Sequence, residues 1–158
     1  MLKTIFDTDT CANCRNCCVF EEQSTWELPT FSADTAARLN GYVLTRIGNR
    51  VRVTLPCDET HTAKPCPFLD PESGCTLPPE EKPFACSIWP LRVMRTETGE
   101  TILALYRGCP GLPEEKIPAL KALLDSGLRD RIYQEAAADP SLILPYHENY
   151  IPLDTNIL

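Results

Sequence analysis

The sequence predicts an α+β protein: a small, irregular, Pro- and Cys-rich domain organised by metal, with two β-hairpins and a C-terminal helical segment. Nine cysteines and 15 prolines in 158 residues leave room for few long helices. Two pairs of β-rich segments flank turn residues, and helical spacing of apolar residues is clearest near the C-terminus. We expect a single cysteine-cluster domain over residues 1–158. Its metal-binding core spans about 7–112, and a C-terminal helix and strap span 113–158.

The first half of the chain carries one helix signal and one hairpin signal. Residues 31–40 predict a helix, because Ser32 can cap its start and the following residues favour helix. Residues 42–47 and 51–55 are rich in β-branched and aromatic side chains. Gly48-Asn49 lies between these two segments and predicts a hairpin turn.

The second half predicts another hairpin followed by helix. Residues 91–96 and 101–106 form the predicted hairpin. Apolar side chains recur at helical spacing over 114–124, so one face of that helix is expected to be buried. Gly127 should break or bend the helix before it continues over 128–138. The Pro-punctuated tail after it predicts an extended strap.

Residues 56–90 are the most unusual stretch of the chain. They contain eight prolines and four cysteines, which leaves little room for backbone ladders. Such a segment needs another organising force, and bound metal is the natural candidate.

Charge and hydropathy exclude several classes of function. The formal net charge of −7 makes nucleic acid a poor partner, since phosphate binding needs a basic face. No stretch approaches the ~18 apolar residues of a membrane helix, and the first residues do not resemble a signal peptide. We therefore expect a cytoplasmic protein without a membrane partner. Thiols stay reduced there, and an odd number of cysteines also argues against a purely disulfide framework.

The strongest chemical signal is the run Cys11-Ala12-Asn13-Cys14-Arg15-Asn16-Cys17-Cys18. Cys11, Cys14 and Cys17 share a two-residue spacing that can turn three sulfurs onto one point. Three thiolates on a short loop plus a remote fourth are typical of a 4Fe–4S cluster. One or two zinc ions are the alternative, because four thiolates also bind zinc readily. Cys18 adjoins Cys17, so their side chains are expected to diverge.

The remaining cysteines lie far along the chain. Cys66 and Cys109 are each followed by Pro, as is the remote cysteine in ferredoxin-type patterns. Cys57 is interpreted as a spare thiol. Eight thiols are expected to gather around the first loop, as two four-thiolate sites or one cluster plus one zinc. These candidate metal ligands are Cys11, Cys14, Cys17, Cys18, Cys66, Cys75, Cys86 and Cys109.

The ordered motifs resemble a known family from about residue 7 to 112. The run Cys11-x-x-Cys14-x-x-Cys17-Cys18 is similar to the signature of the YkgJ-type family, the CxxCxxCC cysteine-cluster proteins regarded as a zinc- or iron-chelating domain. The later motifs with the same resemblance are Cys66-Pro67-Phe68-Leu69, Gly74-Cys75, Pro83-Phe84-Ala85-Cys86 with Trp89-Pro90, and Cys109-Pro110-Gly111. The resemblance implies metal binding, and it implies a distant relation to flagellin lysine N-methylase.

Three functions are compatible with these patterns. The first is a metal-binding module that acts as a redox or metal accessory protein. The second is a metal-dependent, methylase-like enzyme that modifies a protein or peptide side chain. The third is a structural zinc protein that binds a protein partner. The sequence shows no nucleophile–base arrangement, phosphate loop or dinucleotide fingerprint, so it identifies no catalytic residue and leaves enzymatic activity open.

Overall fold

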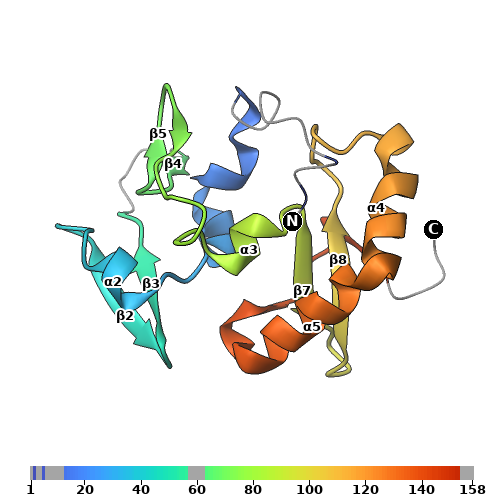
Figure 1. The fold of residues 1–158 in the computed structure, drawn as a ribbon. Coiled ribbons are helices and arrows are strands. Elements are labelled where there is room, and N and C mark those ends of the chain that lie inside the picture. The colour runs from blue at the N-terminus through green and yellow to red at the C-terminus, as the bar shows by residue number, and fades with distance from the viewer. Residues whose placement is uncertain (1, 3–4, 6–12, 57–62, 154–158) are drawn as a thin grey trace. The chain divides into compact units, whose positions relative to one another are not determined.

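The structure is a computed structural model that describes residues 2, 5, 13–56 and 63–153. The chain divides into two compact units, which are described separately (Figure 1). We call Arg15–Ser87 the cysteine unit, and Met1–Cys14 with Ile88–Leu158 the sheet unit. Helices and short antiparallel sheets occur together, so the predicted α+β class is confirmed. The expectation that 1–158 is one domain stays a prediction.

The cysteine unit consists of short elements. Its β2–β3 hairpin was predicted and is confirmed, with Leu44 opposite Val53 and Ile47 opposite Arg50. The elements are η1 (Asn16–Cys18), β1 (Val19–Phe20), η2 (Glu22–Glu27), α2 (Ala33–Ala36), β2 (Val43–Ile47), β3 (Arg50–Thr54), β4 (Lys64–Pro65), β5 (Leu69–Asp70), β6 (Gly74–Cys75) and α3 (Phe84–Ser87).

The helix predicted over 31–40 forms, but it is shorter than expected. Ser32 caps α2 as predicted, because its side chain accepts a hydrogen bond from the Thr35 amide at 3.1 Å. The helix cannot include Phe31, since both backbone groups of Phe31 pair with Val51 at 2.8 and 2.9 Å. Pairing with the hairpin therefore sets where the helix begins.

The core of the cysteine unit is a cluster of apolar side chains around Phe31 and Phe68. Their ring centroids lie 5.1 Å apart, and Cys66 packs against the same cluster. The buried members are Phe20, Leu28, Phe31, Ala36, Val53, Leu55, Phe68 and Leu77. The Cys66 segment is therefore attached to the core by apolar packing as well as by its backbone.

The sheet unit is built on a four-stranded sheet of order β10-β8-β7-β9. The predicted hairpin β7–β8 is confirmed, and the tail predicted as a strap forms both outer strands, up to residue 153. Tyr150 is fully buried and holds the tail against Tyr106, at 5.5 Å between ring centroids. The strands are β7 (Leu91–Arg95), β8 (Thr101–Tyr106), β9 (Ile143–Pro145) and β10 (Tyr150–Pro152).

The helices of the sheet unit follow β8. Gly127 has φ 111 inside a π-helical turn, which interrupts the helix at the predicted position. Figure 1 shows α5 beside β7, and the two elements are in contact. The elements are η3 (Glu114–Lys116), α4 (Ile117–Leu123), η4 (Leu124–Leu128), α5 (Arg129–Ala138) and η5 (Pro140–Leu142). Within the described part of the chain, no helix is both long and apolar enough to span a membrane.

Leu103→Ala is expected to destabilise the protein by about 2–5 kcal/mol, because it leaves a cavity where a fully buried side chain packed. Urea unfolding followed by circular dichroism measures the change. Leu44→Ala is the matched control, since the Leu44 side chain is 41% exposed. It should cost less than about 1 kcal/mol. Equal losses in the two variants would contradict this account of the core.

Candidate metal centre

The β1–β4 ladder brings two distant cysteine segments together in the cysteine unit. Val19 lies opposite Pro65 in this antiparallel pair. The ladder is extended by one more hydrogen bond, in which the Cys66 amide donates to the Cys18 carbonyl at 2.7 Å. The backbone of Cys18, the last residue of the first cysteine run, is therefore held beside Cys66.

A second small hairpin, which begins just after Cys66, carries Cys75. Strands β5 and β6 pair with Leu69 opposite Cys75. The Leu69 amide donates to the Cys66 carbonyl at 2.9 Å, and the Thr76 amide donates to the Phe68 carbonyl at 2.9 Å. These bonds close a compact loop from Cys66 to Thr76, with one thiol near each end.

The thiols of these segments affect one another electrostatically. Burial raises the pKa of Cys66 to about 11, while an N–H···S hydrogen bond from the Phe68 amide lowers it. Charges on Cys75 and then Cys17 make smaller contributions to this rise, so these two thiols lie within electrostatic reach of Cys66. Mutual repulsion opposes their joint ionisation, and a bound cation would relieve it.

Cys17 and Cys18 are closer than the sequence led us to expect. Their Sγ atoms lie 3.7 Å apart, so the side chains do not diverge. Two sulfurs bound at ~2.3 Å to one tetrahedral zinc would be separated by about 3.8 Å. The spacing of this pair therefore fits two ligands of a single ion.

Four of the predicted ligands lie on adjoining segments within the cysteine unit. Cys17, Cys18, Cys66 and Cys75 lie on the adjoining segments described above. Cys86 also belongs to the cysteine unit, where it lies in α3, whereas Cys14 and Cys109 belong to the sheet unit. Cys11 and Cys57 lie outside the described residues. The convergence of Cys11, Cys14 and Cys17, and the gathering of all eight thiols, stay predictions.

The cysteine thiols are suitable ligands for a soft metal, but among the described residues they are not arranged as a complete coordination sphere. All seven described cysteines are thiols without a disulfide, and Cys14 and Cys75 are exposed. Across residues 13–56 and 63–153, no three His, Cys, Asp or Glu side chains are placed to hold one ion together. Thiolates are the ligands that zinc and iron–sulfur clusters take.

Neither family models, nor curated proteins, nor solved structures give a match to this chain.

Asp70 is a supporting residue that the sequence analysis missed. Its Oδ1 accepts hydrogen bonds from the Ser73 amide at 2.6 Å, the Ser73 hydroxyl at 2.7 Å and the Glu72 amide at 2.9 Å. These bonds close the turn between β5 and β6, and so support the loop that carries Cys75. The signal was present in Asp70-Pro71-Glu72-Ser73-Gly74, because Asp, Pro and Gly in this order are typical of a turn.

The turn should depend on pH through Asp70. Hydrogen bonds from the Ser73 amide, the Ser73 hydroxyl and the Glu72 amide lower the pKa of Asp70 from its ordinary 3.8, and Arg15 adds a smaller lowering. The stabilisation is therefore present above 3.8 and lost as the pH falls through the lowered folded value. Carboxyl ¹³C titration by NMR should show this, and Ser73→Ala should move the midpoint upward. An unchanged midpoint in that variant would disprove the assignment.

Proposed function

We propose that this protein binds metal through cysteine thiolates of the cysteine unit and serves as a metal or redox accessory module. The observation that supports this most strongly is the meeting of two distant cysteine segments. Cys18 and Cys66 are joined through their backbones at 2.7 Å, and Cys75 follows on the adjoining hairpin. Thiols packed only as small apolar groups would not need such a shared location.

The exposure of these cysteines also supports a binding role. Cys75 is exposed, and Cys17, Cys18 and Cys66 are half-buried. A ligand set at this depth can exchange metal with solvent or with another protein. The resemblance of the cysteine motifs to the YkgJ-type proteins supports the same proposal.

The proposed site could hold either zinc or an iron–sulfur cluster, and different features favour each. The 3.7 Å spacing of the Cys17 and Cys18 sulfurs favours zinc, because both can reach one tetrahedral ion. The three-thiol spacing that starts at Cys11 and the two Cys-Pro pairs favour an iron–sulfur cluster. Four cysteines of a 4Fe–4S cluster bind four different irons, so their sulfurs lie farther apart than those that share one ion.

The protein groups would act in the same way with either occupant. The Phe68 amide donates to the Cys66 sulfur and favours its thiolate form, which is the form that binds metal. The backbone bond between Cys18 and Cys66 holds their two segments together. A bound cluster would supply one-electron chemistry, whereas zinc would supply a fixed structure.

Anaerobic purification, metal analysis and absorption spectroscopy test the proposal. An iron–sulfur protein should be brown, with sulfur-to-iron charge-transfer absorption and acid-labile sulfide. A zinc protein should be colourless, with a stoichiometric amount of zinc per chain. Reduced protein that holds neither metal, even after anaerobic reconstitution with iron and sulfide or with zinc, would overturn the proposal.

A further inference from the structure

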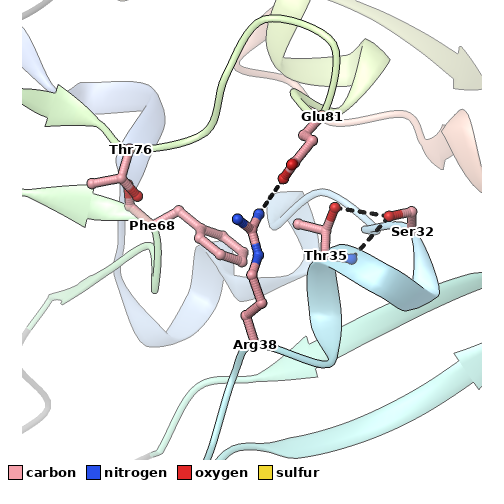
Figure 2. A network of polar contacts seen from close by, with 6 residues as sticks. All are labelled: Ser32, Thr35, Arg38, Phe68, Thr76 and Glu81. Atoms are coloured by element: carbon pink, nitrogen blue, oxygen red, sulfur yellow. Dashed lines mark hydrogen bonds and ion pairs between the residues drawn. The ribbon is translucent and has the colours of Figure 1, made fainter.

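Arg38 links two parts of the cysteine unit that carry cysteines, although it lies outside every cysteine motif. Figure 2 shows its side chain beside the Phe68 ring with the guanidinium turned toward Glu81. The guanidinium carbon lies 5.5 Å from the centroid of the Phe68 ring. Its Nη2 donates to Glu81 Oε2 and forms an ion pair with that carboxylate.

Phe68 connects this contact to the thiols. Phe68 is 7% exposed, and its ring packs on Phe31 as well as under the Arg38 guanidinium. The Phe68 amide donates to the Cys66 sulfur. Its carbonyl accepts from the Thr76 amide at 2.9 Å and from the Thr76 hydroxyl at 3.1 Å, directly after Cys75. A shift of Phe68 would therefore move both thiol-bearing ends of the loop.

Glu81 lies on the other side of Arg38, in the segment that leads from Cys75 to Cys86. A turn holds this segment, in which the Glu81 amide donates to the Pro78 carbonyl at 3.0 Å. The Cys86 amide donates to the Pro83 carbonyl at 3.0 Å a few residues later. Arg38 therefore contacts the loop that contains Cys66 and also the connection to α3.

The Arg38–Glu81 ion pair is expected to affect local geometry more than the global stability of the protein. The side chains of Arg38 and Glu81 are 49% and 37% exposed. Exposed ion pairs contribute little to global stability. Their contribution to local geometry can still be large when they fix a ring whose backbone carries the hydrogen bonds around a metal ligand.

We propose that Arg38 and Glu81 form a clamp that positions Phe68 and thereby slows the release of metal from Cys66 and Cys75. The inference rests on the proposed metal-binding function. Arg38 is a positioning residue, because it acts on the thiols through Phe68 and the loop. Planarity matters as well as charge, since a guanidinium can stack on a ring while it pairs with a carboxylate.

Cobalt(II) is a suitable probe, because its absorption bands report thiolate ligation and site geometry. Arg38→Gln and Glu81→Gln should each speed transfer of Co²⁺ to excess EDTA by about tenfold, within the usual range for groups that support a ligand. The double variant should be no faster than Arg38→Gln, because both changes break one clamp. Arg38→Lys should be intermediate, since it keeps the charge but loses the planar group.

The matched control is Arg131→Gln. Arg131 and Glu135 form another exposed pair, in α5 of the sheet unit, with an N···O distance of 4.0 Å and side chains 58% and 44% exposed. This variant should release Co²⁺ at the wild-type rate. The urea midpoints of Arg38→Gln and Arg131→Gln should be similar, because neither pair carries much global stability.

The outcomes separate the clamp from the proposed function. Wild-type protein without a cobalt–thiolate spectrum would overturn the clamp, and the proposed function falls with it only where reconstitution with iron and sulfide or with zinc also fails. Normal wild-type binding with unchanged release from Arg38→Gln would overturn the clamp alone. An equally fast release of Co²⁺ from Arg131→Gln would also overturn the clamp, because the effect would not be specific to Arg38. Release from Arg38→Lys at the wild-type rate would overturn the requirement for a planar guanidinium and the clamp with it.

Discussion

Cys66→Ser is expected to weaken metal binding by at least about a hundredfold, which is the upper end of the range for loss of a group that merely supports a ligand. A hydroxyl is a far poorer ligand than a thiolate for zinc or iron. Cys66 also contacts the other segments of the site: its amide donates to the Cys18 carbonyl, and charges on Cys75 and Cys17 act on its thiol. Replacement of Cys66 therefore removes a thiol ligand at the place where the segments that carry Cys18 and Cys75 adjoin.

Competition with a zinc chelator on reduced protein under anaerobic conditions measures the loss. Cys57→Ser provides the matched control, because Cys57 is the one cysteine interpreted as a spare thiol. It should bind zinc as tightly as the wild type. Wild-type affinity in Cys66→Ser would show that the metal site does not include Cys66.

Metal removal is expected to unfold the Pro-rich stretch 56–90 and to spare the helix near 114–124. Small zinc domains gain apparent free energies of about 10–16 kcal/mol from their metal, so loss of the metal is loss of folding energy. In the described residues this stretch has only two-residue strands and the four-residue α3. In contrast, α4 has its own buried side chain at Leu120, 2% exposed.

Hydrogen exchange measured with and without chelator tests this expectation. Amides of residues 63–87 should exchange much faster after metal removal, while those of α4 and α5 keep their protection. Addition of metal should restore the slow exchange, which controls for damage by the chelator. Equal loss of protection in both regions would contradict a local role for metal.

Local signals accounted for much of the secondary structure. Both hairpins formed where turn residues separate β-rich segments, because strand pairing across a short turn depends mainly on nearby residues. Ser32 and Gly127 acted at the predicted positions through their own backbone and side-chain chemistry. The predicted helix began too early, because Phe31 pairs instead with Val51, 20 residues farther along the chain, and it also ended sooner than predicted, at Ala36.

The sequence by itself determined that the candidate site is rich in cysteine, and it predicted thiolate donors there. Cysteine spacing and the reducing compartment expected for this chain predict thiolate ligands, and the order of the motifs resembles a metal-chelating family. These inferences need only residue types and local spacing. The same reasoning could not show which remote cysteine lies beside the first run.

Only the tertiary structure decided that Cys66 adjoins Cys18 and that Cys75 follows on a paired strand. The pairing of β1 with β4 depends on two-residue strands, which are too short to leave a periodic pattern in the sequence. The contact of Arg38 with Phe68 and Glu81 likewise joins residues 30 and 43 positions apart, so no local rule predicts it. Long-range packing therefore selected the partners, because the free energy of each contact depends on segments that meet only in the folded chain.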